Sequence, residues 1–188
     1  MTTMAPARSH TEIILAGSGG QGLILSGILL AEAAMNEGLN VVQTQSYGIA
    51  SRGGLSLAEV IVDDDEIVFQ QVRRPDCVLA LSEEAAAKFG GWAAKGVPVV
   101  YDDTIVAARS GENFIGLPFT QTASDLGGAG SVNILALAAV AALTGVVQAA
   151  SLEQLIRRNF RGAALDLNLK MLAAGAELAG AAAARPVA

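Results

Sequence analysis

The stretch from Glu12 to Gly22 reads EIILAGSGGQG and decides the fold, and it leads directly into an apolar run over Leu23–Met35. The four apolar residues Ile13–Ala16 predict a short buried strand, and a G-x-G-x-x-G spacing then begins at Gly17. Together these features predict a strand, a glycine turn and a helix. Glycine suits such a turn because it tolerates positive φ and lets another backbone or a phosphate come close. The free N–H groups that open the helix favour an anion over the turn.

Two other interpretations of the glycine turn stay open. In a dinucleotide-binding enzyme, an acidic residue about 20 residues further on binds the ribose. The next expected strand, Asn40–Gln45, offers no carboxylate, so the sequence disfavours NAD binding by this chain. The turn can also serve only to pack the helix against the sheet.

Size and composition predict one domain with an unusual amount of apolar surface. The chain has 188 residues, of which 52% are hydrophobic and only 16% charged, and its mean hydropathy is +0.47. The longest apolar run, Ile134–Leu143, falls short of the ~20 residues that a membrane-spanning helix needs. We therefore expect the apolar surplus to lie against other subunits, since permanent interfaces resemble a divided core.

The expected domain covers residues 12–180, with a disordered leader over 1–11 and a flexible tail over 181–188. The leader is polar and lacks the apolar core of a signal peptide, so we expect a cytoplasmic location. The tail is of low complexity and is expected to fray.

The sequence contains few residues that could support cysteine-based metal binding, nucleophilic catalysis or nucleic-acid binding. Cys77 is the single cysteine and lies in an apolar strand pattern, which predicts an inert buried thiol and no disulfide, cysteine zinc site or thiolate-held iron–sulfur cluster. His10 is the single histidine, so Ser–His or Cys–His catalysis is disfavoured. The formal net charge of −6, without a Lys/Arg cluster, argues against nucleic acid as a partner.

Two groups of acidic residues are expected to be loop residues. Asp63–Glu66 lacks the further spaced oxygen ligands of a metal site and is expected to be a solvated turn, so no metal is expected. Asp102 and Asp103 end a predicted strand, and an enzyme that acts alone through them is a disfavoured alternative.

Strand and helix patterns alternate through the first half of the chain. After the glycine turn and its helix, strands are expected at residues 40–44, 55–62, 67–69, 77–81 and 97–101. This alternation predicts an α/β fold, a single Rossmann-like domain with a mainly parallel sheet covered by helices and with sites at the carboxyl ends of the strands. Both glycine stretches, Gly17–Gly22 and Gly48–Gly54, follow early strands and are expected at one edge.

The second half is expected to be helical, with helices at residues 120–126, 131–143, 151–160 and 163–184. Ser82 and Ser131 are expected to cap helices, and Ser151–Gln154 fits a capping box. The first helix, Leu23–Glu37, is apolar on almost every side, which predicts that it is buried all round.

Further motifs follow in order between and after the glycine stretches. They are Tyr47-Gly48 with Ser51-Arg-Gly-Gly54, Ala58-Glu-Val60, Pro75-Asp76, Ala123-Ser-Asp-Leu-Gly127, Asn133 and Asn168-Leu-Lys170. With them, the chain resembles the gamma subunit or gamma domain of the 2-oxoacid:acceptor oxidoreductases from Glu12 to about Leu178. The sequence departs from the family pattern at Ile49-Ala50, where a proline and an acid are usual, and at Ala138, where glycine is common.

The resemblance implies a subunit without catalytic residues of its own. Enzymes of this family oxidatively decarboxylate a 2-oxoacid to acyl-CoA and CO2 and pass electrons to ferredoxin or NAD. The resemblance implies thiamine diphosphate, Mg2+ and [4Fe-4S] clusters in partner subunits, and coenzyme A at the subunit interface. The sequence agrees with this division, since it has no Gly-Asp-Gly stretch for a magnesium–diphosphate site.

The resemblance and the glycine chemistry together assign the candidate coenzyme A site to the two glycine stretches. Its residues are Gly17, Ser18, Gly19, Gly20, Gln21, Gly22, Tyr47, Gly48, Ser51, Arg52, Gly53 and Gly54. Arg52 can present its planar fork to a phosphate, or form an ion pair within this chain or with a partner. For Tyr47 the alternative is packing, and for Gln21 it is an amide that fixes the turn.

A stand-alone Rossmann-like nucleotide-binding or regulatory module is the alternative function. The low charge content favours the subunit, because a solitary soluble domain seldom has so few charges on its surface. Expressed alone, a subunit is expected to aggregate, whereas a module is expected to be well behaved and to gain thermal stability with nucleotide.

Overall fold

The computed structural model describes residues 10–47 and 54–184. Within these ranges six strands form one sheet in the order β2-β3-β1-β4-β5-β6. The strands are β1 (His10–Ser18), β2 (Asn40–Tyr47), β3 (Leu55–Asp63), β4 (Cys77–Ala80), β5 (Val99–Asp102) and β6 (Phe114–Leu117). The helices are α1 (Leu23–Asn36), α2 (Glu83–Phe89), α3 (Phe119–Asp125), α4 (Val132–Thr144), α5 (Ala149–Asn159) and α6 (Gly162–Ala183), with short 3-10 helices η1 (Gly90–Lys95) and η2 (Ala129–Ser131).

The sheet is mixed, with parallel pairing on one side of β1 and antiparallel pairing on the other. Strands β1, β4, β5 and β6 run parallel to one another. Strand β3 pairs antiparallel with both β1 and β2. The expected α/β fold with a mainly parallel sheet is therefore confirmed, and β3, which pairs antiparallel with both of its neighbours, accounts for the antiparallel part.

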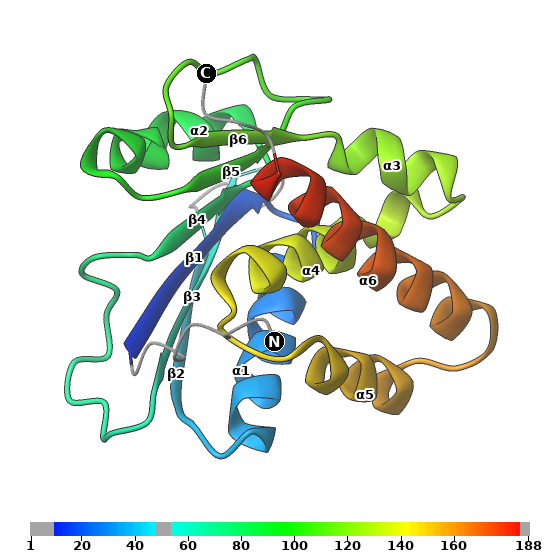
Figure 1. Ribbon diagram of the computed structural model, residues 1–188, viewed down its shortest axis with the longest axis horizontal. Helices are drawn as coiled ribbons and strands as arrows, with labels where there is room; N and C mark the ends of the chain where they lie inside the picture. Colours follow the sequence, from blue (N-terminus) through cyan, green and yellow to red (C-terminus); the bar gives the residue numbers. More distant parts are fainter. Residues whose placement is uncertain (1–9, 48–53, 185–188) are drawn as a thin grey trace.

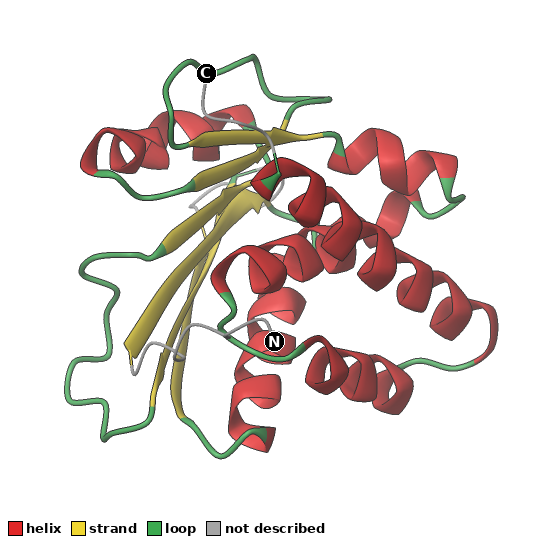
Figure 2. Cartoon of the chain, in the orientation of Figure 1, coloured by secondary structure: helices red, strands yellow, loops and turns green. Residues whose placement is uncertain are grey.

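Helices cover the two faces of the sheet unequally (Figures 1 and 2). Helices α1, α4, α5 and α6 lie on one face, and α2 with η1 lies on the other. Side chains of β1 alternate between the two cores: Ile13 and Leu15 face the larger helical layer, while Ile14 and Ala16 face α2. All four are buried, as expected for a strand that is covered on both sides.

The long C-terminal helix packs closely along α4. A Cβ atom at Gly175 of α6 would lie 2.1 Å from the backbone oxygen of Leu135 and 2.8 Å from Cβ of Ala138. The absence of a side chain at Gly175 therefore allows the two helix backbones to approach each other. This packing buries most of the alanine-rich helix α4.

Two strand expectations need correction. Residues 67–69 form a loop, not a strand, and Val68 and Phe69 are 76% and 60% exposed because no neighbouring strand pairs with them. The short strand β6 was not expected. It depends on pairing with β5, with Val99 opposite Phe114, a contact that the local pattern does not reveal.

One helix cap is confirmed and two are wrong. The Ser82 hydroxyl accepts a hydrogen bond of 3.2 Å from the backbone N–H of Ala85 and caps α2 as expected. The side chain of Ser131 makes no capping hydrogen bond to α4. Helix α5 begins two residues before Ser151, after an extended Gln148, so the capping box is not used.

The structure also refines the expected ends of the domain and the environment of the first helix. Strand β1 includes His10 and Thr11 of the expected leader, and α6 extends to Ala183. Helix α1 is not buried all round, because one side of it faces outwards. None of the described helices is long and apolar enough to cross a membrane.

Candidate functional site

The glycine turn joins β1 to α1 at the carboxyl end of β1 (Figure 1). Gly20 and Gly22 have φ angles of 96° and 76°, which L side chains rarely adopt. Gly17 needs glycine for a different reason, because a Cβ there would lie 2.3 Å from Oε1 of Gln21. The turn thus requires glycine for its backbone angles at two positions and for space at a third.

The side chain of Gln21 fixes the turn. Its Oε1 accepts a hydrogen bond of 2.6 Å from the backbone N–H of Ser18, and its Nε2 donates one of 2.7 Å to the carbonyl oxygen of Leu81. Leu81 directly follows β4, so one amide connects the ends of two neighbouring strands. The structure supports the turn-fixing interpretation of Gln21, and its contact with a coenzyme stays a prediction.

The two glycine stretches meet at one edge of the sheet, as far as their described ends show. The backbone N–H of Gly19 donates a hydrogen bond of 2.9 Å to the carbonyl oxygen of Gly54. The strand register also places Ser18 opposite Leu55, at the start of β3. The first turn is therefore bonded directly to the end of the second stretch.

Part of the predicted site lies outside the described residues. These residues are Gly48, Ser51, Arg52 and Gly53. Tyr47 ends β2, opposite Ser56 in β3, and only its backbone is described. The roles predicted for these residues stay predictions.

Asn133 connects the beginning of α4 to the beginning of α1. Its Nδ2 donates a hydrogen bond of 3.2 Å to the carbonyl oxygen of Gly22, and its own carbonyl oxygen accepts one of 3.3 Å from the hydroxyl of Ser26. The motif analysis named Asn133 but assigned it no role at the site. An asparagine at the start of an otherwise apolar helix was the available signal.

The electrostatics of this edge favour an anion. Neither α1 nor α4 has an acidic residue in its first turn, and no side chain caps the N-terminus of either helix. Free backbone N–H groups at helix starts attract negative charge. The described polar groups of the turn are backbone amides, the Gln21 amide and the Ser18 hydroxyl, which suit binding and orientation of a ligand and not proton transfer at neutral pH.

Asp102 and Cys77, two side chains considered as reactive groups, are buried and have structural roles. The Asp102 carboxylate is fully buried and accepts hydrogen bonds from the N–H of Thr104 and from both the N–H and the hydroxyl of Thr120. It therefore fixes the loop after β5. Burial, with a smaller contribution from Asp76, raises the pKa of Cys77 to about 12, so this thiol is inert.

An ion-pair cluster lies at the opposite end of β1 from the glycine turn, where β1 begins and β3 ends. Nδ1 of His10 lies 2.5 Å from Oδ2 of Asp63, and its Nε2 lies 3.1 Å from Oε1 of Glu12. The second carboxylate oxygen of Glu12 accepts hydrogen bonds of 2.6 and 2.7 Å from the N–H groups of Arg73 and Arg74. This cluster holds the start of β1 against the end of β3 and the loop that follows.

The cluster shifts the pKa values of its members. The hydrogen bond to Asp63, supported by that to Glu12, raises the pKa of His10. Burial alone would raise the pKa of Glu12, but hydrogen bonds from Arg74, His10 and Arg73 outweigh it and lower the pKa. The N–H of Asp65 and then His10 lower the pKa of Asp63.

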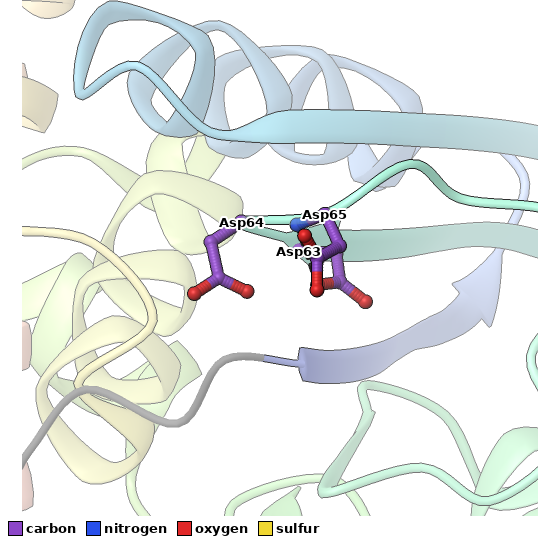
Figure 3. Close-up of side chains that lie close together, drawn as sticks. All are labelled: Asp63, Asp64 and Asp65. Atoms are coloured by element: carbon purple, nitrogen blue, oxygen red, sulfur yellow. Dashed lines mark hydrogen bonds between the residues drawn. The ribbon is translucent and has the colours of Figure 1, made fainter.

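Figure 3 shows the carboxylates of Asp63, at the end of β3, and of Asp64 and Asp65, on the turn that follows. One oxygen atom from each of the three lies within 4.8 Å of the others. Asp64 and Asp65 are exposed, and Asp63 is already bonded to His10 and to the N–H of Asp65. Exposed acidic groups of this kind are common without an ion, so the cluster gives no metal assignment.

Fold and site together define a class of protein: a Rossmann-like α/β domain whose glycine edge suits an anionic ligand and whose described residues place no nucleophile or acid–base pair there. The chain belongs to the pyruvate ferredoxin/flavodoxin oxidoreductase family, whose model matches residues 12–178. The resemblance inferred from the sequence is thereby confirmed.

Relatives of known name are subunits of 2-oxoacid oxidoreductases. The chain is similar to the 2-oxoglutarate synthase subunit KorC of Archaeoglobus fulgidus, with 41% identity over 170 residues that cover 90% of this chain and 88% of the relative. It is also similar to the ketoisovalerate oxidoreductase subunit VorA of Methanothermobacter thermautotrophicus, with 32% identity over 93% of this chain but only 37% of the longer relative.

Two solved structures share the fold. One is the gamma subunit of a keto/oxoacid ferredoxin oxidoreductase from Geobacter sulfurreducens, with a TM-score of 0.81 and 37% identity over 92% of this chain and 98% of that one. The other is the 2-oxoglutarate:ferredoxin oxidoreductase of Magnetococcus marinus with 2-oxoglutarate, coenzyme A and succinyl-CoA bound. It gives a TM-score of 0.84 and 25% identity over 93% of this chain and 32% of that one.

Proposed function

We propose that this chain is the gamma subunit of a multi-subunit 2-oxoacid oxidoreductase that converts a 2-oxoacid and coenzyme A to acyl-CoA and CO2. Support comes from relatives that are themselves subunits of such enzymes and that match this chain over most of its length. A stand-alone nucleotide-binding module is not favoured, because these relatives act as parts of larger enzymes.

The substrate class that the comparisons favour is 2-oxoglutarate. Sequence identity is 41% to a subunit named for 2-oxoglutarate, 32% to one named for ketoisovalerate and 29% to one shared by pyruvate and ketoisovalerate oxidoreductases. In this proposal the pocket for the 2-oxoacid lies on the thiamine-binding subunits. Those subunits select the substrate, and this chain belongs to the complex that uses it.

The role of this chain is to line the coenzyme A channel with its glycine edge. The observation that carries this assignment is the hydrogen bond between Gly19 and Gly54, which joins the glycine turn to the described end of the second glycine stretch. Backbone N–H groups at the start of α1 favour the phosphates of the coenzyme. Arg52, which belongs to the second glycine stretch, supplies a charged contact to a phosphate or to a partner subunit.

The redox chemistry is assigned to the partner subunits. Thiamine diphosphate with Mg2+ supplies decarboxylation there, and [4Fe-4S] clusters pass the electrons to ferredoxin or NAD. The chain itself has one buried cysteine, which suits neither a cluster nor a nucleophile. We expect the complex in the cytoplasm.

The experiment that tests this function is subunit omission. The complex is assembled without oxygen, with and without this chain, and reduction of a viologen dye is followed with 2-oxoglutarate, pyruvate or 2-oxoisovalerate plus coenzyme A. The expected result is activity with 2-oxoglutarate that requires this chain. Equal activity and equal coenzyme kinetics without the chain would contradict the proposal, and a preference for pyruvate would contradict the substrate class.

A further inference from the structure

Helix α1 carries an apolar stripe on its outer side. Leu25, Ile28 and Met35 are 39%, 40% and 63% exposed, and Glu32 lies between Ile28 and Met35 on the same side. These four residues, spaced by three or four positions, form one face of the helix and are called the α1 stripe below. A surface helix normally presents polar residues on this side, so the stripe is an exception.

The inner side of α1 is already fully used for folding. Leu23, Leu29 and Leu30 are at most 1% exposed, and the helix packs on β2, β3, α4 and α5. The stripe is therefore surplus to the core of this chain. Exposed apolar side chains that align along one helix are typical of a surface that another chain covers.

Glu32 adds a negative charge to the apolar stripe. It is the charged member of the stripe, and among the described residues no cation forms an ion pair with it. A carboxylate covered by a partner without a counter-charge would be costly. The matching surface is therefore apolar with a lysine or arginine placed opposite Glu32.

The longer relatives indicate which chain provides that surface. The matched region makes up 37% of the VorA relative and 32% of the 2-oxoglutarate:ferredoxin oxidoreductase chain. In those proteins the rest of the polypeptide, about two thirds of the whole chain, is covalently joined to a domain like this one and is thus its permanent neighbour. Relatives that this chain covers to 88% and 98% of their length are named as subunits, so under the proposed function the corresponding polypeptide is a companion chain.

We propose that the α1 stripe is the docking surface for this companion chain, the one that corresponds to the remainder of the longer relatives. The proposal rests on the proposed function. The stripe begins at Leu25 in the first turn of α1, and α1 itself starts directly after Gly22, so a chain seated on the stripe lies beside the glycine turn. Docking through the stripe therefore places the companion chain where it can close the coenzyme A channel.

The test is co-purification of the complex with variants of this chain. The chain carries a tag and is co-expressed without oxygen with the other subunits, and the captured chains are identified and quantified by mass spectrometry. Ile28→Lys is expected to lower capture of the companion chain about tenfold or more. Val68→Lys is the matched control, because Val68 is 76% exposed on the loop after β3, at the other edge of the sheet, and it is expected to capture as the wild type does.

A charge variant keeps the test valid if Ile28→Lys fails to fold. Glu32→Lys replaces an exposed-side charge, so it leaves the buried side of α1 unchanged and is expected to lower capture and to make it more sensitive to salt. Circular dichroism confirms that each variant keeps the helical content of the wild type.

The possible outcomes distinguish failure of the stripe proposal from failure of the proposed function. If the wild type captures the companion chain and both stripe variants capture it equally well, the stripe proposal is wrong while the proposed function stands. Equal loss with Val68→Lys would also overturn the stripe. A tagged wild type that forms a dimer with itself, made monomeric by Ile28→Lys, would assign the stripe to a second copy. A wild type that captures no companion chain would overturn both proposals.

Discussion

Gln21 and Leu81 are joined by a 2.7 Å hydrogen bond from the side-chain amide to the backbone carbonyl, across 60 positions of sequence. The same amide accepts a hydrogen bond from the N–H of Ser18. We predict that Gln21→Ala lowers the free energy of unfolding by about 1–3 kcal/mol, because Ser18 and Leu81 each lose a partner in a partly buried place.

The measurement is the urea midpoint from pulse proteolysis, which needs little protein. The matched control is Gln121→Ala, which removes an exposed hydrogen bond of 2.8 Å between Gln121 and Asp125 on α3 and is expected to cost at most about 0.5 kcal/mol. Equal midpoints for the two variants would show that the amide does not hold the turn.

Two glycines of α6 are expected to respond to alanine in opposite directions. At Gly175 a Cβ would meet the backbone oxygen of Leu135 at 2.1 Å, so Gly175→Ala forces α4 and α6 apart and is expected to cost about 3 kcal/mol. At Gly180 no heavy atom lies within 4 Å of the added Cβ, so Gly180→Ala is expected to stabilise the helix by about 0.5 kcal/mol.

Thermal unfolding followed by circular dichroism checks this pair of variants. The two melting temperatures should lie on opposite sides of the wild-type value. A Gly175→Ala variant as stable as the wild type would mean that the two helices are packed less closely than described.

The His10 cluster predicts a pH dependence of stability. Because the folded pKa of His10 lies above its ordinary value of 6.5, its stabilising contribution is complete below about pH 6.5 and is lost as the pH rises through the folded pKa. The pKa values of Glu12 and Asp63 are lowered from 4.5 and 3.8, so their contribution is present above those values and is lost as the pH falls below them.

The wild type should therefore exceed His10→Asn in stability most clearly between about pH 5 and 6.5. The difference should stay below about 1 kcal/mol, because the His10 side chain is 48% exposed. Urea midpoints of both proteins between pH 5 and 9 measure it. An advantage of the wild type that grows towards pH 9 would have the wrong sign and would refute the assignment.

Arg52 is expected to act on coenzyme A and not on folding. Arg52→Ala should leave the subunit composition of the complex unchanged and raise the apparent KM for coenzyme A about tenfold, the effect of losing one charge-assisted contact to a phosphate. Arg158→Ala, on the exposed face of α5, is the control. Unchanged coenzyme kinetics in the Arg52 variant would assign this arginine to another contact, and loss of subunits would assign it to the interface.

The local parts of the fold could be predicted from the sequence because short patterns determine them. The strand, glycine turn and helix from Glu12 onwards depend on residues that are neighbours in the chain, and so does the cap at Ser82. The alternation of strands and helices predicted the mainly parallel sheet. The resemblance then suggested the candidate site; the structure places Gly19 beside Gly54, and the binding of coenzyme A there stays a prediction.

The remaining features depend on contacts between distant residues. Strand β6 exists because β5 offers it hydrogen bonds, and Asn133 reaches Gly22 across 111 positions. Helix α1 differs from these cases: its composition predicts burial on all sides, but Ile28 and Met35 are exposed in the structure of the single chain. That prediction failed for the isolated chain, and the difference motivates the α1 stripe as a docking surface.

The measurement that tests the central claim most directly is purification of the tagged chain from its own host without oxygen, followed by mass spectrometry and absorbance spectroscopy. The account predicts stoichiometric companion chains, bound thiamine diphosphate and the absorbance of iron–sulfur clusters. A chain that is recovered alone, soluble and colourless would contradict the assignment as an oxidoreductase subunit.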